Sequence, residues 1–347
     1  MVAGRMGDPS EIRLILAEEI IDGVALGRPL ITDPDLPLKM KENRDEDVIQ
    51  CGACLQGCLM KAKTGEGLSC IVNPEAGRES EQIQVADHPG KVVVVGGGPA
   101  GMQAALTARQ RGYKVSLYDE GELGGQFQLA AMAPGKEMMN KPLQGMIRKV
   151  RKSDITLRLD NSATIQDILN EKPDHVILAT GATSIKLEIE GLNEALDCED
   201  VFMEKRDIGQ RVIIIGGGMI GLEMAEFLAK KGHSITIVEM LEEVASDMEP
   251  ITRKLTMKNL ASMNVSIITG KKVKRFDGHK TFITESGQEV LLGEFDTVVM
   301  AVGTIPTNNL EQPILDSSID FHLIGDAKKP ANIADAVVQG FETACKI

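Results

Sequence analysis

The chain has 347 residues, with 38 Lys and Arg against 51 Asp and Glu and a net charge of -13 at pH 7. This length suffices for about two domains that each bury a core, so a peptide module is excluded. The negative charge repels nucleic-acid phosphates and anionic membrane surfaces alike, and only 3% of the residues are aromatic. We therefore expect neither nucleic acid nor a membrane among its partners.

The apolar runs, the N-terminal segment and the cysteines bear on the compartment in which the protein is found. The longest apolar runs have the length of a strand, as in Val92 to Val95, whereas a membrane span needs about 20 residues. The N-terminal MVAGRMGDPSEIR has no basic region followed by an apolar stretch, which predicts a cytoplasmic protein without a secretory signal. In that reducing compartment the 6 cysteines are expected to be thiols, metal ligands or catalytic groups rather than disulfides.

The first 45 residues contain two Gly-Arg pairs, in VAGRMGDPSEIRLILAEE and in DGVALGRPLITDPDLPLKM. These segments resemble the end of the flavin-binding TIM barrel of the old yellow enzyme family. The resemblance implies that both pairs follow the last barrel strands, where TIM barrels hold phosphate groups. The implied FMN-phosphate residues are Gly4, Arg5, Gly27 and Arg28.

A closed barrel needs roughly 250 residues, so residues 1–45 supply only its last part. FMN is therefore expected only if a barrel partner is present, either a barrel-supplying chain or a homo-oligomer. An enone or enoyl-CoA substrate would bind in that missing barrel. No catalytic residue is assigned, because the residues that protonate such a substrate in the family would lie there.

Four of the cysteines lie within 20 residues in a C-x2-C-x3-C-x11-C pattern, namely Cys51, Cys54, Cys58 and Cys70. Four thiolates at this spacing hold either a tetrahedral zinc ion or an iron–sulfur cluster, and the spacing alone does not separate the two. Cys70 opens CIVNPEAGRE, which resembles the segment after the four-cysteine loop of 2,4-dienoyl-CoA and enoate reductases. Together with the nucleotide motifs that follow, this resemblance favours a [4Fe-4S] cluster.

Two later stretches, VVVVGGGPAG and IIIGGGMIG, each pass from a strand through a glycine turn into a helix and a second strand. The distance from the first glycine to the acid that ends the second strand is 23 residues in both copies, from Gly96 to Asp119 and from Gly216 to Glu239. A dinucleotide site uses these glycines for the tight turn, for approach of the pyrophosphate and for helix packing, while the acid binds a ribose hydroxyl. Two matching copies therefore predict two nucleotide sites.

From about residue 88 the chain resembles the two-dinucleotide-binding flavoprotein reductases. The resemblance implies FAD in the first copy, NAD(P)H in the second, and a Gly-Asp pair in HLIGDA that closes the FAD site before a final helix from about Ile333. The implied FAD residues are Gly96, Gly98, Gly101, Asp119, Gly124, Gly125, Gly325 and Asp326. The implied NADH residues are Gly216, Gly218, Gly221 and Glu239. NADH is favoured over NADPH because the carboxylate of Glu239 repels a 2′-phosphate, and the following MLEEV carries no Arg or Lys.

We therefore predict an α/β fold with two Rossmann-like dinucleotide-binding domains, preceded by a cysteine-rich cluster loop and the last part of a TIM barrel. The predicted domains are the barrel remnant 1–45, the cluster loop 46–88, the FAD domain 89–185 with 300–347, and the NAD(H) domain 186–299.

The predicted function is that of an NADH-dependent oxidoreductase fragment or subunit. Electrons would pass from NADH to FAD, [4Fe-4S] and FMN, and would reduce a C=C bond of the 2-enoate or 2,4-dienoyl-CoA type. One alternative is an electron-input module like the small subunit of glutamate synthase, although that relative carries more N-terminal cysteines. Others are the amine-dehydrogenase branch, whose nicotinamide site has decayed, and a nucleotide-binding remnant without turnover.

Overall fold

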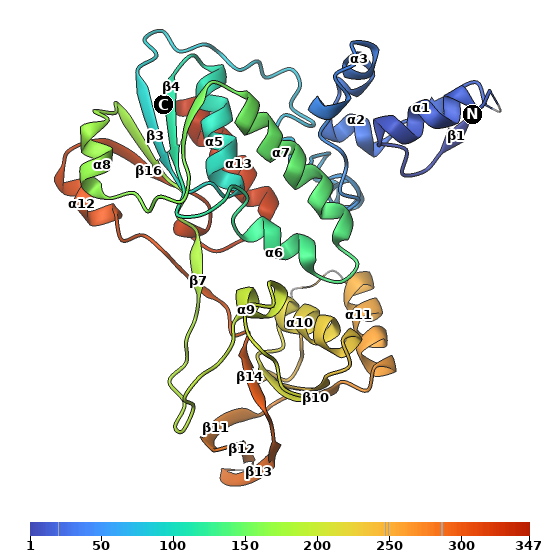
Figure 1. Cartoon of the computed structure of the whole chain (residues 1–347), viewed down its shortest axis with the longest axis vertical. Coiled ribbons are helices and arrows are strands. Elements are labelled where there is room, and N and C mark those ends of the chain that lie inside the picture. The colour runs from blue at the N-terminus through green and yellow to red at the C-terminus, as the bar shows by residue number, and fades with distance from the viewer. Residues whose placement is uncertain (20, 247, 249, 286) are drawn as a thin grey trace. The chain divides into compact units, whose positions relative to one another are not determined.

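The computed structural model describes the whole chain except Ile20, Asp247, Glu249 and Ser286. It divides into unit 1, made of Met1–Ala131, Lys136–Ala182 and Pro306–Ile347, and unit 2, made of Met132–Gly135 and Thr183–Ile305 (Figure 1). Strands β7 (Ala182–Ser184) and β15 (Thr304–Pro306) pair with each other, and each contains a boundary between the units. None of the described helices combines the length and the apolar character that crossing a bilayer requires.

Unit 1 begins with short elements that lead to the cysteine loop. Helix α1 starts where the Asp8 carboxylate accepts a hydrogen bond from the Ser10 N–H at 3.0 Å, and Pro9 occupies its first turn. Strands β1 and β2 pair in parallel, so each Gly-Arg pair lies beyond the carboxyl end of one of two neighbouring strands. The elements are β1 (Val2–Ala3), α1 (Pro9–Ala17), β2 (Val24–Ala25), α2 (Arg28–Thr32), α3 (Leu36–Lys41), the 3₁₀-helix η1 (Asp45–Asp47), the π-helical turn η2 (Gln56–Met60) and α4 (Lys61–Thr64).

The core of unit 1 is a five-stranded parallel sheet in the order β16-β6-β3-β4-β5. Alternate residues of β3 face opposite sides: Val92 and Val94 pack with α5, α7 and α13, whereas Val93 and Val95 pack with α8 and α12. Helices therefore cover both faces (Figure 1). The elements are β3 (Lys91–Val95), α5 (Pro99–Gln110), β4 (Lys114–Tyr118), α6 (Gln126–Met132), η3 (Glu137–Met139), α7 (Asn140–Lys152), β5 (Ile155–Arg158), α8 (Ile165–Asn170), β6 (His175–Leu178), α12 (Glu311–Asp316), β16 (Asp320–Leu323), η4 (Gly325–Ala327) and the predicted final helix α13 (Ile333–Lys346).

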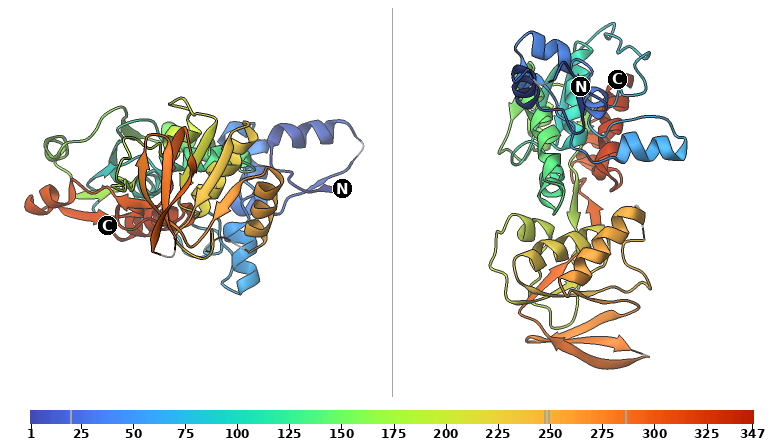
Figure 2. Two further views of the ribbon diagram at one scale, coloured as in Figure 1. Left: turned by 90° about the horizontal axis from the view of Figure 1, so that it is seen from below. Right: turned by 90° about the vertical axis from the view of Figure 1, so that its right-hand side faces the viewer.

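Unit 2 repeats this plan with a four-stranded parallel sheet in the order β10-β9-β8-β14. A three-stranded antiparallel sheet, β11-β12-β13, lies at one end of the unit (Figure 2). Its Phe276 and Ile283 pack against Ile213 and Ile215 of the parallel sheet. The elements are α9 (Cys198–Phe202), β8 (Arg211–Ile215), α10 (Met219–Lys230), β9 (Ser234–Val238), α11 (Pro250–Ser262), β10 (Ser266–Ile268), β11 (Lys272–Asp277), β12 (Lys280–Glu285), β13 (Gln288–Glu294) and β14 (Thr297–Met300).

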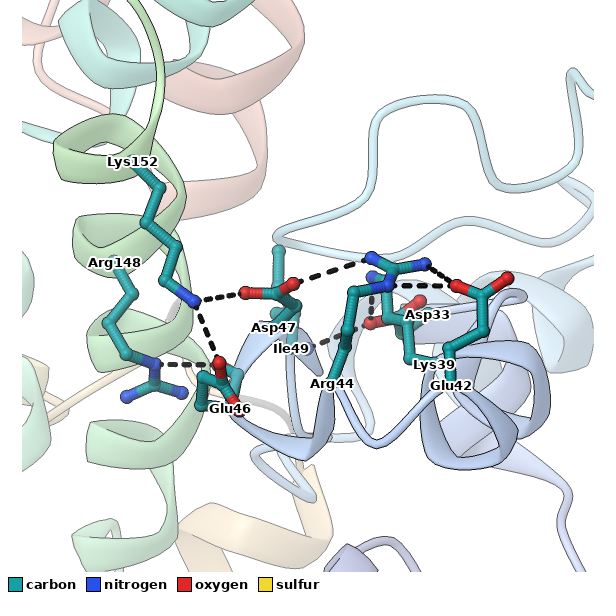
Figure 3. A network of polar contacts seen from close by, with 9 residues as sticks. All are labelled: Asp33, Lys39, Glu42, Arg44, Glu46, Asp47, Ile49, Arg148 and Lys152. Carbon is teal, nitrogen blue, oxygen red and sulfur yellow. Dashed lines mark hydrogen bonds and ion pairs between the residues drawn. The ribbon is translucent and has the colours of Figure 1, made fainter.

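Two kinds of polar contact fasten the N-terminal elements inside unit 1 (Figure 3). The Asp33 carboxylate is 4% exposed and accepts from Lys39 Nζ at 2.7 Å and from the Ile49 N–H at 2.8 Å. Lys152 reaches from α7 to Asp47 of η1, with its Nζ 2.5 Å from Oδ1, but its side chain is 50% exposed. The first contact is shielded from water, whereas the second is open to it.

Replacing Asp33 by alanine is expected to destabilise the segment 33–49 by about 3–5 kcal/mol, because it leaves a largely buried ammonium group without its partner. Lys152→Ala is expected to cost at most about 1 kcal/mol, because exposed ion pairs contribute little. Hydrogen–deuterium exchange of the amides in 33–49 measures both effects. Equal protection of this segment in the two variants would contradict the prediction.

Candidate functional site

The first glycine turn follows β3 and leads into α5. Gly96 has φ +108, and a Cβ there would lie 2.1 Å from the carbonyl oxygen of Ala179. A Cβ on Gly101 would lie 1.8 Å from the carbonyl oxygen of Gly96. At Gly98, by contrast, φ is -71° and a Cβ would meet no described atom within 4 Å. The backbone thus requires two of the three glycines, while the third leaves open space at the N-terminus of α5, where a helix favours anions.

Asp119 and the glycine pair Gly124 and Gly125 lie against this turn. The Asp119 carboxylate, just beyond β4, accepts from the Gly97 N–H at 2.6 Å. The Gly124 N–H donates to the Gly97 carbonyl at 2.9 Å, and a Cβ on Gly125 would lie 3.0 Å from the Cα of Gly98. The structure therefore brings the ELGGQ segment onto the glycine turn.

The returning Gly-Asp pair reaches the same place from β16. Gly325 has φ +61, and a Cβ on it would lie 2.9 Å from the Cβ of Ala100 in α5. Its N–H donates to Gln339 Oε1 of α13 at 2.9 Å, and no sequence pattern predicted this contact. The Asp326 carboxylate accepts from the Ala331 N–H at 3.0 Å, and burial raises the pKa of this carboxyl group. The residues predicted for FAD thus gather around the start of α5.

Unit 2 repeats the turn closely. Gly216 has φ +108, and its Cβ would lie 2.4 Å from the carbonyl oxygen of Ala301. A Cβ on Gly221 would lie 2.1 Å from the carbonyl oxygen of Gly216. Gly218 begins α10 with φ -69°, and a Cβ there would meet no described atom within 4 Å. Both copies therefore leave the same open position at the N-terminus of a helix of 12 residues.

The acid of the second copy also ties the turn together. The Glu239 carboxylate accepts from the Gly217 N–H at 2.6 Å and from the Leu241 N–H at 2.8 Å. This residue is 9% exposed, so its negative charge is held in a fixed position beside the turn. The arrangement matches that of Asp119 and Gly97 in unit 1.

The four clustered cysteines line one pocket in unit 1. Ala53 donates its N–H to Cys51 Sγ at 3.4 Å, and Thr32 Oγ1 lies 3.6 Å from Cys70 Sγ. Burial raises the pKa of the Cys54 thiol to about 11, and the neighbouring cysteines add to this effect. The pocket is lined by Arg28, Ile31, Thr32, Cys51, Gly52, Cys54, Leu55, Gly57, Cys58, Ser69, Cys70, Ile71, Val72 and Pro142.

Glycines that adjoin the cysteines let this loop close. A Cβ on Gly57 would lie 2.6 Å from the carbonyl oxygen of Ser69, and one on Gly52 would lie 2.9 Å from Pro142 Cγ of α7. These two glycines are not among the residues predicted from the sequence, although each adjoins a cysteine in CGAC and GC. The structure also places Arg28 in the wall of the cysteine pocket.

The remaining Gly-Arg residues lie at the strand ends described above. Gly4 and Arg5 are exposed beyond β1, with φ +111 and +50. Gly27 is exposed and directly precedes α2, which begins at Arg28. Parallel neighbouring strands bring such ends to one edge, the edge at which TIM barrels bind phosphate.

Residues 90–317 match the family model described as pyridine nucleotide-disulphide oxidoreductase. The chain belongs to this family. The match includes both glycine turns and both acids, so membership implies FAD and NAD(H) as cofactors. The predicted α/β class with two dinucleotide-binding folds is thereby confirmed.

Individual relatives show which oxidoreductases the chain is similar to over its whole length. An NADH oxidase of Thermoanaerobacter brockii is 38% identical over 360 residues, covering 100% of this chain and 55% of the relative. A cinnamate reductase of Clostridium sporogenes is 32% identical, covering 100% of this chain and 53% of the relative. A solved 2-naphthoyl-CoA reductase complex is 29% identical with a TM-score of 0.91, covering 99% of this chain and 53% of that one.

The chain thus spans about half the length of the curated relatives it matches. These relatives are oxidoreductases, and they confirm the predicted resemblance to enoate-reductase-like flavoproteins. The chain has the fold of a flavin oxidoreductase.

Proposed function

We propose that the chain is the electron-input part of an NADH-dependent flavin and iron–sulfur reductase for activated C=C bonds. In the proposed order, electrons pass from NADH in unit 2 to FAD in unit 1, then to a [4Fe-4S] cluster and to FMN in a completed barrel. The observation that carries the proposal is that one compact unit holds both the FAD-type turn and the four-cysteine pocket. Arg28, expected at the FMN phosphate, lines that same pocket.

The donor set of the pocket fits an iron–sulfur cluster. Its described lining offers four thiols and no carboxylate or imidazole, and thiolates are the usual ligands of such clusters. Ile31, Ile71 and Val72 give it apolar walls that limit access of water. Burial raises the pKa of the Cys54 thiol, so this thiol must lose its proton when it binds the iron of a cluster. When bound, the cluster would supply transfer of single electrons beside carriers that exchange hydride.

The residues of unit 1 have distinct proposed roles toward FAD. The open position at Gly98 and the N–H groups that begin α5 would bind the pyrophosphate. Asp119 keeps the turn closed through the Gly97 N–H and would accept from the ribose with its remaining lone pairs. Gly325 lets the chain approach Ala100 closely, which brings Asp326 toward the same site.

The substrate class follows from the relatives and is proposed here for the complete enzyme. Cinnamate reductase and 2-naphthoyl-CoA reductase are named for a carboxylic acid and a thioester with conjugated C=C bonds. We therefore propose a 2-enoate or an enoyl-CoA type substrate, reduced at FMN in the barrel. The barrel would come from further sequence, from another chain or from a second copy.

An anaerobic titration tests the proposal. The chain is reconstituted with iron, sulfide and FAD, and NADH is added while the visible spectrum is recorded. The expected result is bleaching of the flavin followed by loss of cluster absorbance. Flavin that binds but ignores NADH, or failure to bind flavin, would instead indicate a nucleotide-binding remnant without turnover.

Glu239 is expected to make the reaction prefer NADH over NADPH by at least about 100-fold in kcat/KM, since juxtaposed like charges cost several kcal/mol. Glu239→Gln removes the charge and keeps an oxygen for the Gly217 N–H, although its NH2 group cannot accept from the Leu241 N–H. Because the charge is gone, use of NADPH should rise relative to NADH and the ratio should fall. Stopped-flow reduction of the flavin by each nucleotide measures this. The matched control is Glu243→Gln, an exposed acid paired with Arg253, which should leave the ratio unchanged. Equal use of both nucleotides by the unaltered chain would refute the role of Glu239.

A further inference from the structure

A second group of potential metal ligands lies in unit 1 on β6 and the edge strand β16. The two strands are parallel and their register pairs Asp320 with His175, so the side chains of Asp320, His322 and His175 share one face of the sheet. His175 Nδ1 lies 2.9 Å from Asp320 Oδ2, and His322 Nε2 lies 3.6 Å from the same oxygen. One ligand atom from each of the three residues lies within 4.8 Å of the other two.

One of these ligand atoms lacks a hydrogen bond. His322 Nε2 is buried and has no hydrogen-bond partner among the described residues. Its distance of 3.6 Å from Asp320 is too long for a hydrogen bond. Leaving a buried polar atom unsatisfied is costly, so such an atom requires an explanation, and a bound ion is one of those that apply to an imidazole nitrogen. The His175 ring is held in place, because Tyr113 packs edge-on against it with 6.0 Å between the ring centroids.

We propose that His175, Asp320 and His322 bind a divalent transition-metal ion of the Zn²⁺ type. Tetrahedral zinc with bonds of about 2.0–2.1 Å to nitrogen and about 2.0–2.2 Å to oxygen places its nitrogen and oxygen ligand atoms about 3.3–3.5 Å apart. The two distances to Asp320, 2.9 and 3.6 Å, lie on either side of that separation. Two neutral imidazoles with one carboxylate carry a net negative charge and suit zinc better than magnesium or calcium.

The exposure of the three groups leaves room for a further ligand. The Asp320 side chain is 60% exposed, while His175 and His322 are 24% and 35% exposed. His322 Nε2 itself is buried, so water would reach a bound ion from the side of the exposed Asp320 carboxylate and could complete its coordination there. The site is separate from the cysteine pocket, with which it shares no residue.

The position of the site gives the ion a structural consequence. Strand β16 pairs with the sheet along one side only, and it leads directly to Gly325 and Asp326. An ion shared by His175, Asp320 and His322 would fasten this edge strand to β6. It would thereby restrain the segment that carries the proposed flavin-contacting pair.

The test compares the zinc content of the full chain with that of three variants after equilibrium dialysis against Zn²⁺. His322→Gln and Asp320→Asn are each expected to lose about one zinc per chain, whether or not the cysteines also hold metal. Asp320→Asn keeps an oxygen near His175, and His322→Gln removes no described hydrogen bond, so both variants should fold. His279→Gln, whose ring lies 2.9 Å from the Phe295 carbonyl oxygen, is the control and should retain all zinc.

Zinc-edge X-ray absorption on the unaltered chain provides an independent measurement. The proposed site requires a shell of nitrogen and oxygen at about 2.0–2.1 Å, whereas cysteine ligation gives sulfur at about 2.3 Å. Zinc bound by sulfur alone would overturn the proposal. Unchanged zinc content in both His322→Gln and Asp320→Asn, or an equal loss in His279→Gln, would overturn it as well.

Discussion

Replacing Cys54 by serine is expected to abolish incorporation of the iron–sulfur cluster while FAD still binds and is still reduced by NADH. Cys54 lies in the four-cysteine pocket and packs against the main core of unit 1, so its sulfur has a fixed position. Reduction of any acceptor beyond the flavin should fall by more than about 100-fold, because even loss of an outer-shell partner of a metal site typically costs 10–100-fold. Iron and sulfide analysis measures the first effect, and NADH-driven bleaching of the flavin measures the second.

Cys198→Ser is the matched control for this prediction. Cys198 is a free cysteine in unit 2, and burial raises the pKa of its thiol to about 12. It is not part of the pocket lining, so its replacement should change neither iron content nor turnover. If Cys54→Ser retained its iron, or if downstream turnover survived without the cluster, the proposed relay would be wrong. Zinc in place of iron in the unaltered pocket would also contradict it.

The parts of the fold that the sequence predicted well depend on short-range sterics. Gly96 and Gly216 both adopt φ +108, a conformation that favours glycine, and both lie directly after a β-branched strand. The strand, the turn and the helix are neighbours in sequence, so the spacing carries the geometry.

The parts that the sequence could not predict depend on the order of strands in space. Pro142 of α7 and Arg28 of α2 both line the cysteine pocket, although the two residues are far apart in the chain. His175 and Asp320 are separated by 145 positions and meet because β16 pairs with β6. Neither arrangement leaves a local sequence pattern, because the chain segment between the two residues can vary in length and composition without changing the sequence around either of them.

Gly218, the glycine at the open position of the turn in unit 2, is expected to control the affinity for NADH. Gly218→Ala is expected to leave the stability of unit 2 unchanged or raise it by up to about 1 kcal/mol, because alanine fits this φ and restricts the unfolded chain. NADH affinity should nevertheless fall by about 10–100-fold. The added methyl group occupies the space through which the pyrophosphate approaches the N–H groups of α10. Loss of one charge-assisted hydrogen bond costs about 1.5–3 kcal/mol, which corresponds to this fall in affinity.

Gly221→Val supplies the contrast, because its Cβ would lie 2.1 Å from the Gly216 carbonyl oxygen and the turn itself must move. This variant should lose both NADH binding and thermal stability of unit 2, while FAD in unit 1 is retained. Titration of flavin reduction with NADH and thermal denaturation separate the two effects. A Gly218→Ala chain that bound NADH as tightly as the unaltered chain would show that the open position serves no nucleotide. A loss of affinity without a loss of stability is the result that only a ligand passing close to Gly218 explains.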